Sequence, residues 1–309
     1  MTAHETTPVR VAVIGAGHVG AAFAFALLRS GLASEIVLVD ADHARAEGEA
    51  MDLDHAVPFG RPARVWAGGY ADCVGAAIVV ITAGAGQRPG QTRLDLAKHN
   101  ATVLREIVPQ VARHAPNAVL IVATNPVDVL TMAALQLSGF PPARVMGSGT
   151  ILDTARLRFL LSRRLGVDSR SIHTHVIGEH GDSEVVVWST ATVAGIPLDE
   201  RDHASVTRQT REAAAAVVQR KGHTAFAIGA GLVRIVEAIL RDEKSVLSVS
   251  STVDGAYGIH DVCLSLPSVV GRDGVERVLV PDLDDVERDA LVRSADTIRA
   301  SARSVGFAQ

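Results

Sequence analysis

Short apolar, β-branched runs alternate with longer amphipathic segments through the first half of this chain. The apolar runs predict strands at 9–15, 35–40, 63–67, 77–83 and 118–124. The segments between them have the apolar spacing of helices, at 18–31, 42–57 and 94–114, and a further helix begins near Pro126. Strands and helices that alternate in this way indicate right-handed βαβ units. The pattern therefore predicts an α/β fold with a doubly wound parallel sheet covered by helices on both faces.

The pattern changes after about residue 148. A helical segment at 153–166 precedes strand-like stretches in HTHVIG and EVVVWSTATVAG, and two further helices follow in REAAAAVVQRKG and FAIGAGLVRIVEAILRD. A glycine pair at 229–231 lies inside the last helix, where it indicates close packing against another helix. We expect a Rossmann-type domain at 1–148, followed at 149–309 by a mixed α+β domain that carries substrate groups.

GAGHVG, at residues 15–20, directly follows the first predicted strand and opens a helix. In this context Gly15 allows a tight turn, Gly17 lets the backbone approach a pyrophosphate, and Gly20 lets helix and strand pack closely. Asp40 ends the next strand about 20 residues later, where its carboxylate can accept hydrogen bonds from both ribose hydroxyls and would repel a 2′-phosphate. The sequence therefore predicts NAD rather than NADP. The alternatives are a glycine turn without a ligand and an aspartate that only begins a turn.

Three residues of the second half have acid/base and carboxylate-binding chemistry. His180 stands in GEHGDSE, and LDTARLR places Asp153 and Arg156 at positions i and i+3 of a helix, and so on one face. A carboxylate beside an imidazole raises its pKa and orients the ring, so that the other ring nitrogen can exchange a proton with a reacting oxygen. Arg156 has the planar fork that binds a carboxylate through two hydrogen bonds. These residues predict proton transfer on an acid substrate; the alternative is a structural histidine.

Composition narrows the class of partner. Lys and Arg number 30 against 34 Asp and Glu, a formal net charge of −4, which gives no basic field for nucleic acid or for a membrane surface. The apolar runs are shorter than the ~20 residues of a membrane-spanning helix, and the amino end has no signal-type segment. Cys73 and Cys263 lie far apart, as in proteins of a reducing compartment. We expect a cytoplasmic protein with a small-molecule partner.

Two other catalytic chemistries find little support in the sequence. His173, His175 and His180 are close enough in sequence to suggest metal ligands, but their spacing matches neither H-E-x-x-H nor H-x-x-E-H, and the cysteines are distant. The chain also has no G-x-S-x-G elbow for a serine nucleophile. We expect no metal and no covalent serine chemistry.

Six segments together resemble the lactate/malate dehydrogenase family, and within it the L-lactate dehydrogenases: GAGHVG with Asp40, ITAGAGQRPGQTRLDL, ATNPVD, GTILDTARLR, GEHGDSE and KGHTAFAIG. They occur in the order and approximate spacing of that family, and the resemblance extends from about residue 9 to about residue 300. It implies hydride transfer between C4 of the nicotinamide of NAD and C2 of a 2-oxo acid. It also implies a homotetramer.

The resemblance implies roles for individual residues. His180 matches the proton donor and acceptor, Asp153 its partner, and Arg156 the clamp on the substrate carboxylate. Arg93 matches the arginine that polarises the reacting carbonyl when its loop closes, and Asn125 would hold both cofactor and substrate. The cofactor contacts that we expect are Gly15, Gly17, Val19, Gly20, Asp40, Gly84, Ala85, Asn125 and Ser148.

Gln87 distinguishes lactate from malate in this resemblance. The malate dehydrogenases place an arginine there, because oxaloacetate brings a second carboxylate. With Gln87, oxaloacetate would bury a carboxylate without a cation, whereas the methyl group of pyruvate needs none. Thr224 matches the threonine that the L-lactate dehydrogenases of this family have at that position. We expect pyruvate and L-lactate as substrates; the alternatives are malate, a bulkier 2-hydroxy acid, a solvated Gln87, and a loop shifted so that Arg88 faces the substrate.

Arg158 and His173 suggest a control site. Arg158 lies two positions beyond Arg156 and so points away from the active site on the same helix. The resemblance implies that Arg158 and His173 bind the phosphates of fructose 1,6-bisphosphate across a subunit interface, as in bacterial enzymes of this type that it activates. The alternative is a surface arginine and a histidine at a strand end.

An NAD-binding regulatory module without activity is the competing class of protein. Arg93, Asp153, Arg156 and His180 have complementary chemistry that a sensor would not need together. An assay of NADH consumption with pyruvate and with oxaloacetate distinguishes this module from a lactate and from a malate dehydrogenase.

Overall fold

A computed structural model describes residues 8–86, 92–198 and 203–307 of the chain. Its main feature is a nine-stranded sheet in the order β14-β13-β12-β6-β5-β4-β1-β2-β3. The parallel strands are β1 (Arg10–Ile14), β2 (Glu35–Val39), β3 (Arg64–Ala67), β4 (Ala76–Ile81), β5 (Val119–Val122) and β6 (Val145–Gly147). The antiparallel strands are β12 (Ser245–Val253), β13 (Val262–Gly271) and β14 (Gly274–Val278).

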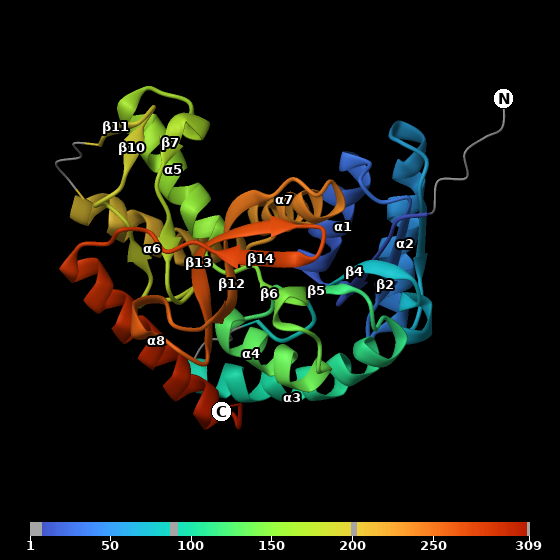
Figure 1. Ribbon diagram of the computed structural model, residues 1–309. Helices are drawn as coiled ribbons and strands as arrows, with labels where there is room; N and C mark the ends of the chain where they lie inside the picture. Colours follow the sequence, from blue (N-terminus) through green and yellow to red (C-terminus); the bar gives the residue numbers. More distant parts are fainter. Residues whose placement is uncertain (1–7, 87–91, 199–202, 308–309) are drawn as a thin grey trace.

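Helices cover both faces of the sheet (Figure 1). They are α1 (His18–Ser30), α2 (His43–Ala56), α3 (Arg93–His114), α4 (Val127–Ser138), α5 (Ile151–Leu165), α6 (His203–Lys221), α7 (Phe226–Leu240) and α8 (Asp285–Ser304). Short 3-10 turns are η1 (Val57–Phe59), η2 (Tyr70–Cys73), η3 (Pro142–Arg144), η4 (Ser169–Ser171) and η5 (Ala256–Gly258). Within the described ranges, no helix combines the length and the apolar character needed to cross a membrane.

Strand β4 shows why its residues form a buried strand. Successive side chains of a strand point to opposite faces, and both faces of this sheet are covered. Ile78 and Val80 pack in the cluster that includes α1, α2 and α7, whereas Val79 and Ile81 pack in the cluster that includes α3, α4 and α8. All four are fully buried. The continuous apolar run therefore reflects a parallel strand with a core on each side.

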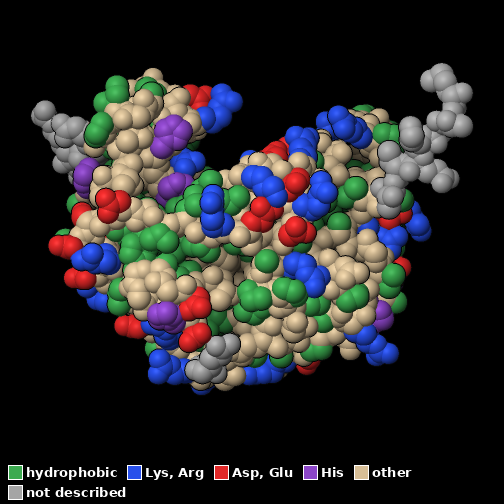
Figure 2. Space-filling model, in the orientation of Figure 1, with side chains coloured by type: hydrophobic (Ala, Val, Ile, Leu, Met, Phe, Trp, Pro, Cys, Tyr) green, Lys and Arg blue, Asp and Glu red, His purple; other side chains and the backbone are tan. Residues whose placement is uncertain are grey.

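A third, smaller apolar cluster joins α5 and α6 to short strands. Its buried members are Leu157, Leu161, Ile172, Val176, Val186 and Val206. The strands are β7 (Ile172–His173), β8 (Val176–Ile177), β9 (Val185–Val186), β10 (Thr192–Val193) and β11 (Ile196–Pro197). They form a three-stranded and a two-stranded sheet apart from the main one. In Figure 1 this part makes a lobe, and the face drawn in Figure 2 is hollowed between that lobe and the side formed by α7 and α1.

The predicted α/β fold is confirmed, as are the strands and helices predicted before residue 148. Gly229 also confirms the predicted helix packing, because a Cβ atom there would lie 3.1 Å from the carbonyl carbon of Ala22 in α1. The sequence analysis did not predict β6, the three antiparallel strands or α8. Because β12 pairs with β6 through Ser250 and Gly147, one sheet continues across residue 148 and is mixed rather than purely parallel.

Candidate active site

The glycine turn after β1 lies at the carboxyl ends of the parallel strands. Gly15 has a φ of +106°, and a Cβ there would lie 2.4 Å from the backbone nitrogen of Ala83. A Cβ on Gly20 would lie 1.9 Å from the carbonyl oxygen of Gly15, so only glycine lets α1 pack this closely on the turn. A Cβ on Gly17 would meet no atom within 4 Å. The turn therefore has open space at Gly17, beside the α1 N-terminus, where a pyrophosphate can approach the backbone.

Asp40 lies beside this turn. Its Oδ2 accepts a hydrogen bond from the Ala16 N–H at 2.6 Å, and its Oδ1 accepts one from the Asp42 N–H at 2.9 Å. A carboxylate oxygen can accept more than one hydrogen bond, so both oxygens can still bind ribose hydroxyls. The open glycine turn and the carboxylate fixed next to it fit an NAD molecule.

The other expected cofactor contacts surround the ends of the neighbouring strands. Val19 is partly buried in the first turn of α1, and Ser148 is buried directly after β6, where its N–H donates to Val122. Gly84 packs closely on Thr124, since a Cβ at Gly84 would lie 2.4 Å from the Thr124 methyl carbon. The structure thus places these residues near the carboxyl ends of the parallel strands, where doubly wound folds bind their ligands.

Asn100, which the sequence analysis did not assign to the site, connects two of its segments. This residue of α3 is fully buried. Its amide donates to the carbonyl oxygens of Ala85 at 3.1 Å and Asn125 at 2.7 Å, and its oxygen accepts from the Ala85 N–H at 2.8 Å. The Asn125 side chain remains exposed. An asparagine on the apolar face of a helix, between Leu96 and Leu104, is the pattern that could have predicted this role.

His180, Asp153 and Arg156 come together as the sequence predicts. His180 Nδ1 lies 2.5 Å from Asp153 Oδ2, and Arg156 Nη1 donates to Asp153 Oδ1 at 2.8 Å. The Asp153 side chain is 3% exposed, Arg156 15% and His180 25%. Helix α5 carries the aspartate and the arginine, while the histidine comes from the segment after β8. The arrangement is a histidine–carboxylate pair with a cation beside it.

Charge and burial determine the pKa values of this group. The Asp153 charge outweighs the effect of burial on the imidazole and raises the pKa of His180 to about 9. Burial would raise the pKa of Asp153, but the His180 and Arg156 charges together lower it. The pair is therefore a carboxylate and an imidazolium near neutral pH, and the imidazolium holds a proton that it can donate.

Arg93 lies at the first residue of α3, after the glycine-rich loop. Its Nη2 donates to Asp182 Oδ1 at 2.8 Å, and both side chains are more than half exposed, at 59% and 77%. Asp182 belongs to the same GEHGDSE segment as His180. The structure thus places Arg93 beside the histidine segment, but paired with a carboxylate of the protein.

Of the residues predicted to select the substrate, the structure describes Thr224. Gln87 and Arg88 lie outside the described residues. Thr224 is partly buried just before α7. The neighbouring His223 stacks on His18 of the glycine turn, with ring centroids 3.8 Å apart. The segment that carries Thr224 therefore lies directly against the predicted cofactor turn.

Arg158 and His173 lie on the lobe beside the site. Arg158 Nε and Nη2 both donate to the Thr174 carbonyl, at 3.1 Å and 2.9 Å, and His173 is exposed. Burial, together with the charges of Arg158 and His173, lowers the pKa of His175 to about 4. Arg158, His173 and His175 thus lie close to one another on this lobe. Among the described residues, no three His, Cys, Asp or Glu side chains are grouped as metal ligands.

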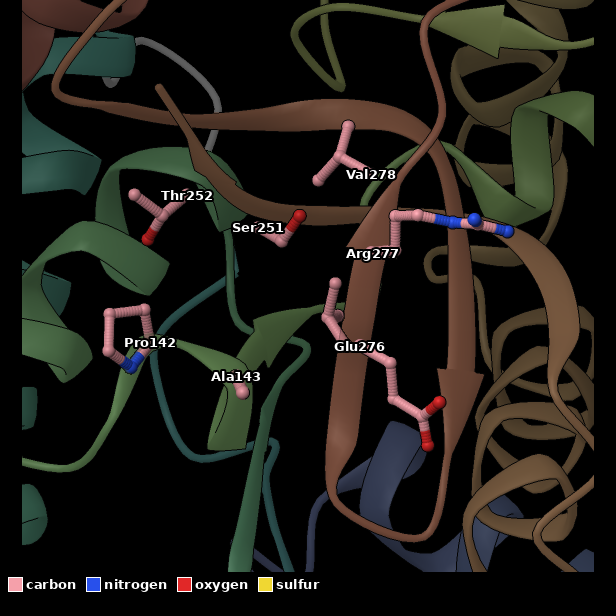
Figure 3. Close-up of a pocket in the computed structure, with 8 residues that line it drawn as sticks. Pro142, Ala143, Ser251, Thr252, Glu276, Arg277 and Val278 are labelled. Atoms are coloured by element: carbon pink, nitrogen blue, oxygen red, sulfur yellow. The ribbon is translucent and has the colours of Figure 1, made fainter. Parts of the chain in front are cut away.

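A small pocket of about 150 Å³ lies elsewhere, between β12, β14 and η3 (Figure 3). Its lining includes Ser251, Glu276 and Arg277, and in Figure 3 the two charged side chains point in different directions. None of the predicted site residues lines it. The pocket is therefore separate from the candidate active site.

Comparisons with known proteins cover nearly the whole chain. A model of the lactate/malate dehydrogenase NAD binding domain matches residues 9–147, and one of the lactate/malate dehydrogenase alpha/beta C-terminal domain matches residues 150–306. The chain is 49% identical to an L-lactate dehydrogenase of Synechococcus sp. (strain JA-3-3Ab), over 95% of this chain and 98% of that protein. It is 50% identical to one of Moorella thermoacetica, over 94% and 96%. A crystal structure of the minor L-lactate dehydrogenase from Enterococcus mundtii in a ligand-bound form superposes with a TM-score of 0.94 at 40% identity, over 97% of this chain and 99% of that one.

Proposed function

This chain belongs to the lactate/malate dehydrogenase family, and from that premise we propose that His180, Asp153 and Arg156 carry out its chemistry. The protein is an NAD-dependent oxidoreductase that interconverts L-lactate and pyruvate, rather than malate and oxaloacetate. The contact of 2.5 Å between His180 and Asp153 is the observation that supports the proposed roles most strongly.

His180 is the proton donor when pyruvate is reduced and the acceptor when lactate is oxidised. Its Nδ1 is held by Asp153, so Nε2 is the nitrogen that exchanges a proton with the substrate oxygen. Asp153 orients the ring and stabilises the imidazolium. The histidine thus holds the proton at one defined atom.

Arg156 binds the substrate carboxylate. Its Nη1 is held by Asp153, which fixes the guanidinium plane and leaves its other N–H groups for a second carboxylate. Asp153 therefore orients both the proton donor and the clamp. Arg93 is paired with Asp182 in this structure. To polarise the substrate carbonyl, its guanidinium would have to leave that ion pair and contact the substrate.

The cofactor site occupies the first part of the chain. When bound, NADH supplies the hydride. Gly17 would let the pyrophosphate approach the backbone at the α1 N-terminus, Gly15 and Gly20 shape the turn that allows this, and Asp40 would bind the ribose. Val19, Gly84, Ala85, Asn125 and Ser148 would complete the site. We assign NAD binding to the domain of residues 1–148, which also contributes Gln87, Arg93 and Asn125 to the substrate, and the other substrate groups to residues 149–309.

The direct test is the oxidation of NADH, followed by absorbance, with pyruvate and with oxaloacetate as alternative substrates. We expect kcat/KM to be higher with pyruvate. A preference for oxaloacetate would contradict the substrate assignment, and no turnover with either 2-oxo acid would contradict the proposed chemistry.

The specificity role of Gln87 predicts the effect of one substitution. Q87R adds a cation opposite the variable end of the substrate, and a hydrogen bond to a charged group contributes about 1.5–3 kcal/mol. We therefore expect kcat/KM to rise about tenfold or more for oxaloacetate and to fall for pyruvate. Q110R, at an exposed position of α3, is the control and should leave the preference unchanged. If Q87R leaves it unchanged as well, Gln87 does not select the substrate.

We propose that fructose 1,6-bisphosphate binds at Arg158 and His173. Arg158 lies on α5 with Asp153 and Arg156, and His173 of β7 lies seven residues before His180, so a ligand that binds one conformation better can alter substrate affinity. The expected result is a pyruvate half-saturation about fivefold lower with the effector, measured at sub-saturating pyruvate. Fructose 6-phosphate, which has a single phosphate, is the control. An unchanged half-saturation would contradict the effector site.

We propose a homotetramer that acts in the cytoplasm, in fermentation of pyruvate. Large apolar side chains support the assembly, because Phe25, Met51 and Phe59 on α1, α2 and η1 are 51%, 61% and 79% exposed. Cys73 and Cys263 are both free and buried, in keeping with a reducing compartment. Light scattering after size-exclusion chromatography tests the assembly: a mass near 32.4 kDa would mean a monomer and would contradict it.

A further inference from the structure

Three elements hold the backbone just before and at His180. The Gly178 N–H donates to the Ser265 carbonyl of β13 at 2.8 Å. The Glu179 N–H donates to the Ser294 hydroxyl of α8 at 2.8 Å. The His180 N–H donates to Asp128 Oδ2 of α4 at 2.8 Å. Of the three acceptors, only the Asp128 carboxylate can carry a charge.

Asp128 belongs to the ATNPVD segment and lies in the first turn of α4, where the helix dipole favours a negative charge. Its side chain is buried, with 2% of the residue exposed, and its Oδ1 makes no hydrogen bond to any described residue. A buried carboxylate oxygen without a hydrogen-bond partner destabilises the fold, so its presence calls for a role other than stability. The position of Asp128 against the proton donor suggests that purpose.

We propose that Asp128 is a positioning residue for His180: its carboxylate fixes the His180 backbone and adds a second negative charge that helps the imidazole keep its proton. The inference rests on the proposed proton-donor role of His180. The ATNPVD segment would then contribute two residues to the site: Asn125 to cofactor and substrate, and Asp128 to the histidine.

Several charged groups lie close to His180 and Asp128. Asp153 and Arg156 face the histidine from α5, with opposite effects on its pKa. Glu179, on the histidine segment, and the Cys263 thiol of β13 both lie near Asp128. Glu184, after the histidine, is buried close enough to Asp153 that burial and that charge raise its pKa to about 8. Asp128 thus adds to a field in which Asp153 is dominant.

The pKa of Asp128 determines the pH range in which its charge can stabilise the His180 imidazolium. Burial raises the pKa of Asp128 to about 6, although the neighbouring Ser250 hydroxyl and the His180 N–H oppose that rise. Asp128 is therefore charged above about pH 6 and neutral below it. Its charge can raise the pKa of His180 only above that pH, whereas its hydrogen bond to the backbone does not depend on the charge.

The test is D128N, because an asparagine oxygen can still accept from the His180 N–H while the charge is lost. For pyruvate reduction, kcat/KM of the unchanged protein should fall as pH rises through the His180 pKa of about 9. In D128N the imidazolium loses stabilisation, so its pKa falls and the decline should move about one pH unit lower. Below about pH 6 the two profiles should converge.

E287Q is a matched control. Glu287 is also buried, and its carboxylate accepts backbone hydrogen bonds from Trp188 and Ser189. Because it lies on α8 and none of its hydrogen bonds reaches the histidine segment, E287Q should leave the pH at which kcat/KM declines unchanged. If E287Q and D128N move the decline equally, the effect is one of general stability and the proposal is wrong.

A second measurement separates this inference from the proposed function. Histidine labelled with ¹³C at Cε1 gives an NMR titration for each ring, and the His180 signal is the one missing in H180N. We expect the His180 titration to move to lower pH in D128N. An unmoved titration would overturn the role of Asp128, whereas retained activity of H180N would overturn the proton role alone. If D128N does not fold, D128S, whose hydroxyl also accepts from an N–H, is measured in the same way.

Discussion

Replacing His180 with asparagine is expected to lower kcat for pyruvate reduction about 100-fold to 10,000-fold, the contribution typical of a positioned general acid. Asparagine can accept a hydrogen bond or donate one to Asp153, but its amide cannot transfer a proton near neutral pH. The Asp153 carboxylate, 3% exposed, also loses the cation that lowers its pKa. Steady-state rates with saturating NADH measure the loss, and fluorescence titration measures NADH affinity, which should change little.

The control for H180N is H260N. His260 also pairs with an aspartate, at 2.6 Å from Asp254, but that pair is exposed and belongs to the segment between β12 and β13. This variant should keep full activity. A loss of less than tenfold in H180N would mean that another group supplies the proton, and the assignment of His180 would fail.

R156K is expected to raise the pyruvate KM about 100-fold. Lysine keeps the charge but not the planar fork, so it cannot bind Asp153 and a substrate carboxylate in one fixed plane. Losing one charge-assisted hydrogen bond of about 1.5–3 kcal/mol corresponds to roughly 10-fold to 150-fold in affinity. The lost hydrogen bond weakens substrate binding and does not remove the proton donor. We therefore expect kcat to fall less than kcat/KM.

R163K, an exposed arginine on the same helix, is the matched control and should leave KM unchanged. Thermal unfolding of both variants shows whether the fold is intact. If R156K keeps the pyruvate KM of the unchanged protein, Arg156 orients Asp153 but does not bind the substrate carboxylate.

The alternation of apolar and amphipathic segments was sufficient to predict the helices and all strands but β6 in the first half of the fold. Buried parallel strands are apolar on both faces, so their runs are visible in any sequence. Strand β12, with the sequence SVLSVSSTV, was missed for the opposite reason. Ser248, Ser250 and Ser251 interrupt its apolar pattern although all three are buried. They are buried because helices α4 and α5 pack against β12, a tertiary contact that the sequence pattern does not reveal.

The sequence by itself determined the chemistry: glycines before a helix, an aspartate at a strand end, and an imidazole, a carboxylate and a guanidinium in recognisable segments. It also predicted that His180, Asp153 and Arg156 meet, whereas only the tertiary structure decided the other contacts of the site. Asn100 joins Ala85 to Asn125, Arg93 pairs with Asp182, and Asp128 accepts a hydrogen bond from the His180 N–H. Hydrogen bonds act over about 3 Å, whereas their partners are far apart along the chain. Their identity therefore follows from the path of the backbone, which no single segment specifies.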